Sequence, residues 1–555
     1  MTTQLKLSTG CRKGLYGLVA LLLVTLILPN FIKNSYAEGF KFYYKSRSGA
    51  LISTTSIYPS YEDISDLSSI QVNPDQEKGY LIVLNAPDTW NSNATAGVRF
   101  AINIDGQIVA DGVYTNTSAG QQGIPITIVT LQGLSAGTHV IKGQWCVQDG
   151  GVGYLGEVSD TILSVVEIPA GAKSYMSSRS GELNYTDSFY PSYGDISDLS
   201  PIQVSPDQEK DYLIILNAPD SWNSNATAGV RFAINIDGQI VADGVYTNTS
   251  AGQQEIPITI VTLQRLSAGT HVIKGQWCTQ DGGAGYLGGI SDTTLSVIEI
   301  PAGAKSYMSS RSGAVNYTDS QYPSYEDIND LSSIEVNPDQ EKDYLIILNA
   351  PDTWNSVGSV GVRFAIDIDG KVVADGVYTN TSAGTQSLPI TIVTVQRLSA
   401  GTHMIKGQWC VQDGGAGFLG GIAKTNLIVV DAEANITETP GCPGSTSLNL
   451  TLNKTTLKPG DTLNIDLHIT NTSTPRNVDI KIWFEVPSLG LISYISSAGV
   501  NLTGCMDYSL KEFISIPFTG DFPLGTYKVG ARLLNSITGE EISKNIETFT
   551  YSSAQ

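Results

Sequence analysis

The chain has 555 residues, of which 53 are acidic and 32 are basic, so its formal net charge at pH 7 is −21. This length exceeds what one hydrophobic core usually serves, and several domains are therefore expected. A chain this acidic does not favour nucleic acid or anionic membranes as partners, because both need cationic patches.

The first 37 residues have the pattern of a secretory signal peptide. Basic residues precede an apolar run at 15–28, and Ser35-Tyr36-Ala37 places small residues at the first and third positions of a cleavage site. We expect a mature chain that begins at Glu38 and is extracellular or held at the cell surface. Its net charge would be −25, because the segment carries four basic and no acidic residues. The competing interpretation is an uncleaved anchor, since the run approaches the roughly 18 residues that a span needs.

A unit of 132 residues occurs three times in the chain. The sequence LSAGTHVIKGQWCVQDGG at 134–151 returns at 266–283 and at 398–415, with a single substitution in each later copy. A fixed period of this length indicates one structural unit copied in tandem. The joints (IPAGAKSYMSSRSG) are short, so the units must lie close together. The assigned segments are 1–37 for the signal peptide, 38–172, 173–304 and 305–434 for the repeats, and 435–555 for a final domain.

Each repeat reads as a series of short strands. Apolar residues alternate with others at 98–104, which is typical of a half-buried strand. Asp105-Gly106 then predicts a tight hairpin turn, because both central positions of such a turn need positive φ. Runs at 124–131 and 161–168 are rich in β-branched residues, and no helical stripe appears. The prediction is an all-β fold of three antiparallel jelly-roll or sandwich repeats.

The repeated motif itself reads as one strand. His139 and Trp145 share a face that we expect in the core, whereas Cys146 lies on the other face as a partly shielded thiol. We interpret His139 as a hydrogen-bonded core histidine and not as a metal ligand, since no second ligand sits at a suitable spacing. The repeat cysteines, predicted to stay reduced, are Cys146, Cys278 and Cys410.

The motif G-T-H-x-I-K-x-Q-W near the end of a β-rich unit resembles the penultimate strand of tumour-necrosis-factor-like and complement-head-like jelly rolls of bacterial and phage surface proteins. This resemblance covers the three repeats. It implies binding or structural modules, many of them trimeric, and not enzymes. A cysteine directly after the tryptophan is not a feature of that group, and its role stays open.

Two arrangements of the repeats compete. Near-identical copies supply the same heterologous interface three times, as a closed pseudo-threefold head requires. Beads in a row are the alternative. We favour beads, because every copy is acidic and no apolar outward-facing stripe stands out in the sequence.

The segment 435–555 lacks the repeat and resembles an immunoglobulin-like sandwich appended to secreted bacterial proteins. Leu463, Ile465 and Ile469 alternate with polar residues in one of its strands. Trp483 is expected to lie exposed on an outward face. Cys442 and Cys505 both fall in this segment and can form a disulfide in an exported protein, which the chain-entropy model values at about 4 kcal/mol.

The candidate ligand-binding residues are the tryptophans of the repeated APD[TS]WNS sequence. We place them in a loop between two strands, where a tryptophan beside Asn and Asp can stack on a sugar ring. The favoured alternative is a ring that closes one end of the sandwich. These residues are Trp90, Trp222 and Trp354.

Calcium is the one cofactor that the acidic loops suggest, and the support is weak. Asp63 and Asp66 in YEDISDLS are candidate ligands, but nothing has the spacing of a twelve-residue calcium loop. The chain also holds twelve Asn-x-Ser/Thr triplets, Asn93 and Asn225 among them. These would be surface loops bearing sugar in a host that glycosylates them.

No catalytic motif is present: there is no nucleophile elbow, zinc-protease helix, phosphate loop or dinucleotide fingerprint. We therefore expect a non-enzymatic structural or adhesive surface protein that uses its copies for avidity, with surface glycans or other surface proteins as partners. The alternative is a multivalent carbohydrate-binding protein that uses the three tryptophans. A third is a secreted glycoside-active enzyme, whose paired carboxylates are set by space and not by sequence.

Overall fold

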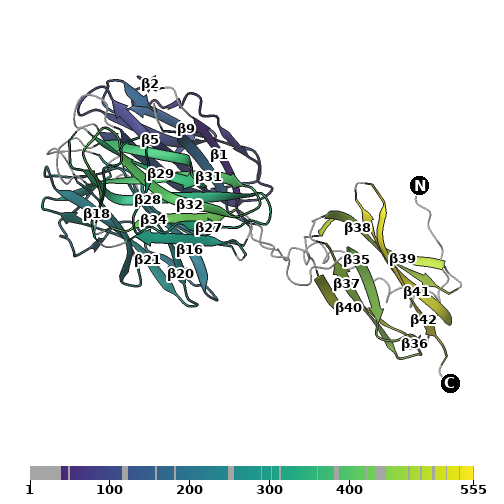
Figure 1. Cartoon of the computed structure of the whole chain (residues 1–555). Helices are drawn as coiled ribbons and strands as arrows, with labels where there is room; N and C mark the ends of the chain where they lie inside the picture. Colours follow the sequence, from purple (N-terminus) through teal and green to yellow (C-terminus); the bar gives the residue numbers. More distant parts are fainter. Residues whose placement is uncertain are drawn as a thin grey trace. The chain divides into compact units, whose positions relative to one another are not determined.

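A computed structural model describes most of the chain, and every regular element in the described residues is a strand (Figure 1). The all-β prediction is therefore confirmed. None of the described residues forms a helix suited to crossing a membrane. The chain divides into two compact units, Ala37–Asn435 and a C-terminal unit that contains Ile436–Gln555. The predicted signal peptide and both Cys442 and Cys505 lie outside the described residues. Those residues are 39–47, 51–115, 123–156, 159–169, 171–179, 183–247, 255–288, 291–301, 303–311, 314–358, 360–379, 387–420, 423–432, 445–472, 476–487, 490–502, 507–520, 522–536 and 538–553.

Repeat one folds as two antiparallel sheets. One sheet has the order β1-β11-β5-β8; in addition, β10 pairs with the second half of β5, and β2 pairs with β10. The other sheet has the order β9-β6-β7, and both β3 and β4 pair with the free side of β9. The chain crosses between the two sheets several times, as it does in a jelly roll, and β6 and β7 form a hairpin within one sheet. The strands are β1 (Lys41–Arg47), β2 (Ile52–Thr54), β3 (Glu62–Asp63), β4 (Ile70–Val72), β5 (Lys78–Asn91), β6 (Gly97–Ile104), β7 (Gln107–Thr115), β8 (Ile124–Leu134), β9 (His139–Val147), β10 (Gly153–Leu155) and β11 (Thr161–Glu167).

Repeats two and three follow the same plan. In repeat two the long strand is split into β16 and β17, and the pairing is otherwise equivalent. The strands of repeat two are β12 (Ser174–Arg179), β13 (Asn184–Thr186), β14 (Gly194–Asp195), β15 (Ile202–Val204), β16 (Lys210–Ala218), β17 (Ser221–Asn223), β18 (Gly229–Ile236), β19 (Gln239–Thr247), β20 (Ile258–Leu266), β21 (His271–Gln280), β22 (Gly285–Leu287) and β23 (Thr293–Glu299). Those of repeat three are β24 (Ser306–Arg311), β25 (Asn316–Thr318), β26 (Glu326–Asp327), β27 (Ile334–Val336), β28 (Lys342–Asn355), β29 (Gly361–Ile368), β30 (Lys371–Thr379), β31 (Leu388–Leu398), β32 (His403–Val411), β33 (Gly417–Leu419) and β34 (Thr425–Asp431).

The predicted hairpin at Asp105-Gly106 is confirmed. Asp105 has φ of 53° and Gly106 has φ of 89°, and the turn joins β6 to β7. Two positive φ values in succession match the right-handed twist of the paired strands. The same turn recurs at Asp237-Gly238 and Asp369-Gly370.

The three repeats pack around a shared apolar axis, so the prediction of beads in a row is wrong. One buried cluster draws on all of them through the outer faces of the β5, β16 and β28 sheets. Successive residues of a strand point to opposite faces, so a run that is apolar throughout is buried on both. Leu81 and Val83 belong to the axial cluster, while Ile82 and Leu84 belong to the core of repeat one. The continuous apolar run at 81–84 is the stripe that the sequence reading missed.

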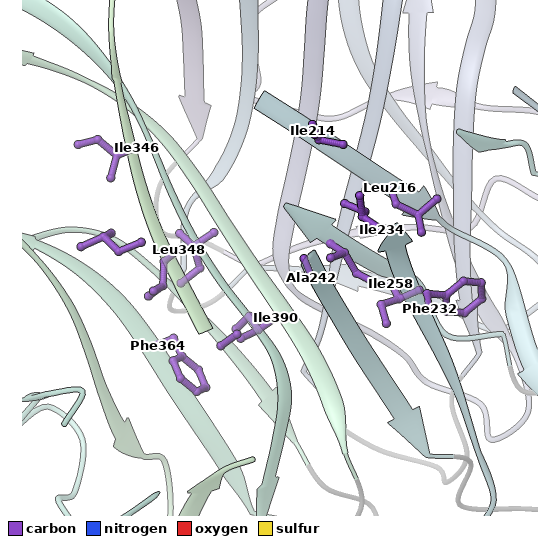
Figure 2. Packing of buried hydrophobic residues seen from close by; sticks show 14 of the residues in the cluster. Ile214, Leu216, Phe232, Ile234, Ala242, Ile258, Ile346, Leu348, Phe364 and Ile390 are labelled. Carbon is purple, nitrogen blue, oxygen red and sulfur yellow. The ribbon is translucent and has the colours of Figure 1, made fainter. Parts of the chain in front are cut away.

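The inner cores are also continuous between repeats. A single cluster covers the sandwiches of repeats two and three (Figure 2). Ile214 and Leu216 contribute to it from repeat two, and Ile346 and Leu348 do so from repeat three. The repeats therefore form one head, a name used below for the unit Ala37–Asn435.

Polar bonds at the axis close the ring of repeats. In each repeat a buried asparagine of the long strand donates to a threonine carbonyl of the next repeat around the ring. Since no water reaches these groups, each bond avoids the cost of an unsatisfied buried amide. The bonds run from Asn85 Nδ2 to Thr391 O (2.8 Å), from Asn217 Nδ2 to Thr127 O (3.0 Å) and from Asn349 Nδ2 to Thr259 O (2.9 Å).

Backbone bonds join the same neighbours away from the axis. Gly112 of β7 lies at this contact. A Cβ at this position would lie 2.8 Å from Cβ of Pro219 in the adjacent repeat, so a larger residue would not fit. Each bond runs from an amide near the end of β7, β19 or β30 to a carbonyl of an adjacent repeat, in the opposite direction around the ring to the asparagine bonds. The pairs are Thr115 N to Glu255 O (3.0 Å), Thr247 N to Ser387 O (2.8 Å) and Thr379 N to Gly123 O (2.7 Å).

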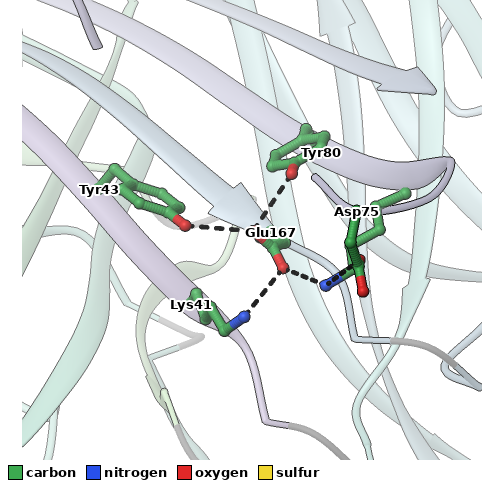
Figure 3. A network of polar contacts seen from close by, with 6 residues as sticks. Lys41, Tyr43, Asp75, Tyr80 and Glu167 are labelled. Carbon is green, nitrogen blue, oxygen red and sulfur yellow. Dashed lines mark hydrogen bonds and ion pairs between the residues drawn. The ribbon is translucent and has the colours of Figure 1, made fainter. Parts of the chain in front are cut away.

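A buried carboxylate lies at the joint end of each repeat. In repeat one it is Glu167, on which Lys41, Tyr43 and Tyr80 converge (Figure 3). Lys78 Nζ donates to it at 2.7 Å. Burial tends to raise the pKa of Glu167, but the Lys78 bond and the charge of Lys41 outweigh it and the pKa is lowered.

Repeat three has the shorter Asp431 at the same position. Its Oδ2 lies 3.7 Å from Lys342 Nζ, so the ion pair is looser. Burial then prevails and raises the pKa of Asp431 to about 6. The ordinary pKa of an aspartate is 3.8. The charged carboxylate of Asp431 therefore lowers the stability of the folded state above pH 6, and this cost disappears as the pH falls from 6 towards 4.

Asp431→Glu is expected to stabilise the head at pH 7.5 by about 1–2 kcal/mol, because the longer side chain reaches Lys342 as Glu167 reaches Lys78. The gain should shrink between pH 6 and pH 4, where Asp431 becomes protonated in the wild type. Urea unfolding at pH 7.5, 5.5 and 4.5 measures this. Glu167→Asp is the converse control and should lose stability at pH 7.5. A gain that is independent of pH would contradict the explanation.

The C-terminal unit is an immunoglobulin-like sandwich. One sheet has the order β35-β37-β40 and the other β36-β42-β41-β38-β39. Leu463, Ile465 and Ile469 are buried, as their alternation predicts. The strands are β35 (Ser447–Leu452), β36 (Thr456–Leu457), β37 (Thr462–Thr470), β38 (Arg476–Val486), β39 (Gly490–Leu502), β40 (Asp507–Pro517), β41 (Gly525–Asn535) and β42 (Glu541–Tyr551).

Trp483 is buried, and the expectation of an exposed ring is wrong. It is only 9% exposed. Its indole lies over Gly530, where a Cβ would come within 2.2 Å of the ring, and the Arg532 guanidinium covers it at 5.9 Å from the ring centroid. Neighbours on the same sheet therefore cover this tryptophan.

Candidate functional site

The three candidate tryptophans lie in strands and not in a loop. Trp90 is in β5, Trp222 in β17 and Trp354 in β28. Trp90 is 7% exposed and Trp222 is 9% exposed. Trp90 and Trp222 are thus largely covered by protein, and the expectation that the tryptophans lie in a loop is corrected.

Each tryptophan stacks on an aromatic ring of the neighbouring short strand. Trp90 stacks on Tyr154 and Trp222 on Tyr286, both with ring centroids 5.4 Å apart. Trp354 stacks on Phe418 at 5.5 Å with an interplanar angle of 8°. Near-parallel stacking of this kind is favourable for aromatic pairs and rigidifies the site.

In repeats two and three a tyrosine extends the row to the sheet edge. Tyr185 of β13 lies opposite Tyr286, and Tyr317 of β25 lies opposite Phe418. The Tyr317 and Phe418 centroids are 6.4 Å apart. Repeat one has Ser53 opposite Tyr154 instead. We use the term aromatic stack for Tyr185, Tyr286 and Trp222 in repeat two and for Tyr317, Phe418 and Trp354 in repeat three.

The edge tyrosines are exposed, unlike the tryptophans. Tyr185 is 67% exposed and Tyr317 is 63% exposed. Leu183 and Phe189 flank Tyr185 in sequence and are 57% and 54% exposed. Large apolar side chains in one short exposed segment mark a contact surface more often than chance exposure does. We call residues 51–57, 183–189 and 315–321 the edge segments.

Each edge segment lies at the end of its repeat away from the joints. Tyr154 of β10 pairs with Trp90, near the end of β5, and with Ser53 of β2 on its other side. At the opposite end of β5, a Cβ on Gly79 would lie 3.1 Å from Ser174 Oγ, where the chain enters repeat two. The edge segment of repeat one thus lies at the opposite end of the long strand from Gly79, and the equivalent pairing of β13 with β22 and of β25 with β33 gives the other two copies the same place in their repeats.

The edge segments are among the places where the copies differ. Between repeats one and two, five of the eight positions at 50–57 differ (50, 52, 53, 55 and 57). Only three of the 49 positions at 74–122 differ from their counterparts. The substitutions bring in Tyr185 for Ser53 and Phe189 for Ile57. Sequence reasoning missed these residues, and a comparison of repeats one and two would have marked 38–45 as strongly as 50–57.

A buried arginine, by contrast, serves the structure. Arg99 donates to Asp111 Oδ2 at 2.7 Å and lies 4.7 Å from the Tyr58 ring centroid. The same nitrogen, Nη2, also donates to Ser291 Oγ of repeat two at 2.7 Å. Burial disfavours the charged guanidinium, but the interactions of Arg99 with Asp111 and Tyr61 outweigh this effect, and the pKa of Arg99 is raised.

The arginine contact differs among the three interfaces. Arg363 of repeat three donates to Ser159 of repeat one at 2.9 Å. The position equivalent to Ser159 and Ser291 is Ala423 in repeat three, which carries no hydroxyl for Arg231. The interface between repeats two and three therefore lacks this bond.

The repeat cysteines are free and fully buried, which corrects the expectation of a partly shielded thiol. Cys146, Cys278 and Cys410 each have an exposure of 0%. Burial raises the pKa of each thiol to about 12, although the neighbouring arginine opposes this. A thiol without accessible thiolate is a poor nucleophile, so these residues have the character of core side chains.

We expect the native protein to resist alkylation at these three thiols. At pH 8 their reaction with iodoacetamide should be at least about 100-fold slower than that of a free cysteine, because both thiolate and access are lacking. Peptide mapping of native and guanidinium-unfolded protein checks this. The unfolded sample is the control and should label fully. Rapid labelling of Cys146 in the native state would contradict the buried assignment.

The repeated histidine is hydrogen-bonded, as predicted, but it sits at the surface end of its strand. His139 Nδ1 lies 2.6 Å from Asp105 Oδ2, and its Nε2 lies 2.9 Å from Ser135 O. The bond to Asp105 raises the pKa of His139. Asp105 also accepts from the Val140 amide at 2.8 Å, which ties the hairpin turn to β9.

The weak calcium candidates do not form a site in the described residues. Asp63 accepts from Lys142 Nζ and from Gln144 Nε2, both at 2.6 Å. Within the described ranges, no three His, Cys, Asp or Glu side chains are grouped so that they could hold a metal ion. The carboxylate of Asp63 is therefore paired with the side chain of Lys142.

Comparison with known proteins identifies no family. No family model matches the chain, and no curated protein does. A CARDB domain of the PF1109 protein from Pyrococcus furiosus aligns at 10% identity and TM-score 0.16, over 20% of this chain and 94% of that one. The sporulation control protein Spo0M of Bacillus subtilis aligns at 14% and 0.16, over 20% and 51%. A β-glucuronidase of Bacteroides uniformis aligns at 10% and 0.16, over 44% and 32%. At these TM-scores the likenesses carry no argument about function.

Proposed function

We propose that this protein is an exported, non-enzymatic surface protein with a structural or adhesive role. The observation that carries the proposal is the head, in which three jelly rolls pack as one body and each carries an edge segment. Repeated weak contacts held on one rigid body bind far more tightly than one contact does. The surface partners proposed are glycans or other surface proteins.

Two further features support this role. The resemblance of the G-T-H-x-I-K-x-Q-W strand to tumour-necrosis-factor-like and complement-head-like jelly rolls implies a binding or structural module. The first 37 residues have the composition of a signal peptide, which supports export. A disulfide between Cys442 and Cys505 in the C-terminal unit remains part of the proposal.

Secretion and attachment are tested together. The chain is expressed with its own first 37 residues, and the intact mass and N-terminal sequence of the exported product are determined. A start at Glu38 supports export with cleavage, whereas retention of 1–37 supports an anchor. Non-reducing peptide mapping checks the Cys442–Cys505 pair. Fluorescent mature protein is then applied to cells, and failure to adhere to any surface tested would refute the adhesive role.

Each of the two alternative functions is tested by its own measurement. Binding of sugar by Trp90, Trp222 and Trp354 loses support, because two of these rings are under 10% exposed and all three are stacked on a neighbour. If substituting alanine at all three lowers glycan binding without loss of folding, that alternative regains its place. Turnover of polysaccharides by the purified mature chain would revive the glycoside-active enzyme.

A further inference from the structure

We propose that the head binds neutral glycans at two sites, one at the edge tyrosine of each aromatic stack, Tyr185 and Tyr317. This inference rests on the adhesive function proposed above and names its ligand class. Each tyrosine would pack its outer ring face against the apolar face of one pyranose ring. Repeat one, with Ser53 at this position, would have no such site.

The geometry of the stack favours a ring-shaped ligand. Trp354 and Phe418 lie nearly parallel, and Tyr317 follows at 6.4 Å in the same row. Since β25 is the last strand of its sheet, no strand covers the outer side of Tyr317. The Tyr317 ring is tilted by 41° to Phe418, which in turn stacks on Trp354. A neighbouring ring restricts the motion of the exposed one, which lowers the conformational freedom lost on binding.

The size of the site argues against a protein partner. A stable protein interface needs roughly 800 Å² from each side. Here the exposed apolar side chains come from one segment of seven residues around the three-residue strands β13 and β25. A single sugar ring, or two, matches such a small site better than a protein surface does.

Charge selects among sugars and disfavours a second copy of the chain. The segments LNYTDSF at 183–189 and VNYTDSQ at 315–321 contain no lysine or arginine, and each contains an aspartate. Sialylated or sulfated glycans would therefore meet like charge. Two strongly acidic heads would repel one another for the same reason. A neutral glycan carries no such penalty.

The difference between repeats supplies the test. The mature chain 38–555 is prepared as wild type, Tyr185→Ser, Tyr317→Ser, the double variant and Ser53→Tyr. Tyr44→Ser is the matched control, because Tyr44 is 44% exposed but lies in β1, outside the edge segments. Probes are insoluble cellulose, chitin, mannan and β-1,3-glucan, and an array that carries neutral, sialylated and sulfated glycans. Thermal unfolding confirms that each variant is folded.

We expect the wild type to bind at least one neutral glycan and not its sulfated or sialylated forms. Each single variant should lose roughly 100-fold in apparent affinity on a dense glycan surface, because the second point of attachment is lost. The double variant should fall to background, Ser53→Tyr should bind more tightly, and Tyr44→Ser should match the wild type.

Three outcomes would overturn the inference. One is wild-type affinity in the folded double variant, and another is a preference for anionic glycans. The third is adhesion of the wild type to cells without binding to any glycan; in that case the adhesive function stands and a protein partner replaces the sugar. If the protein neither adheres nor binds glycans, the proposed function fails together with the inference.

Discussion

Ile215→Asp should unfold or open the head, with a loss of more than about 4 kcal/mol of stability. Ile215 is 2% exposed and lies in the axial cluster, on the outer face of the sheet of repeat two. The substitution removes a buried apolar side chain and places an unpaired carboxylate where three repeats meet. Chemical unfolding measures the loss, and small-angle scattering of residues 38–434 measures whether the head opens beyond the radius of gyration of about 21 Å expected for such a globule.

Ile240→Asp is the matched control for this experiment. Ile240 belongs to the same repeat and is 39% exposed. In separate beads, position 215 would face solvent, and the two variants would behave alike. Equal stability of the two variants would therefore contradict the shared axis, whereas a large difference confirms it.

Arg99→Met should destabilise the protein by about 3–5 kcal/mol, the usual effect of removing one member of a buried ion pair. The substitution leaves Asp111 without its cation and removes the bond to Ser291 across the interface. It also removes the contact with the Tyr58 ring. Guanidinium unfolding at pH 7.5 gives the value directly.

Two controls separate the charge from the interface. Arg265→Met removes an arginine whose side chain is 64% exposed, and we expect no resolvable change. Ser291→Ala imitates Ala423 and removes only the bond between repeats, so its cost should be about 1 kcal/mol. If Arg99→Met costs no more than Ser291→Ala, the ion pair with Asp111 contributes little.

The strands within a repeat were predictable, because their information is local. The strand at 98–104 and the Asp105-Gly106 turn each depend on neighbouring residues, and both are present. The expectation that this strand is half-buried is wrong, because every residue of β6 is buried. The Trp145 face was assigned to the core correctly for the same reason. The packing of repeats was not predictable in this way. Leu81 and Val83 look like ordinary strand residues, and only the neighbouring Ile82 and Leu84 reveal that both faces are buried.

The candidate site shows a similar limit. The tryptophan of each repeat was named as a candidate, but the ring on which it stacks is distant in sequence, as Tyr154 lies 64 residues after Trp90. The exposed residue of the row, Tyr185, comes from a third strand that is distant in sequence from both of its partners. A row of this kind is assembled only by strand pairing, so composition and spacing along the chain cannot reveal it.

Because one polypeptide supplies all three positions around the axis, assembly of the head is unimolecular. A trimer of separate chains dissociates on dilution, whereas here each repeat is held near its neighbours at a fixed effective concentration. The head should thus have the same stability at nanomolar and micromolar protein. Gene duplication also frees each position from strict symmetry: Ser53 and Tyr185 occupy equivalent sites, and Ala423 stands where Ser159 and Ser291 do. Three covalently joined copies can in this way acquire three different surfaces while they keep a common interior.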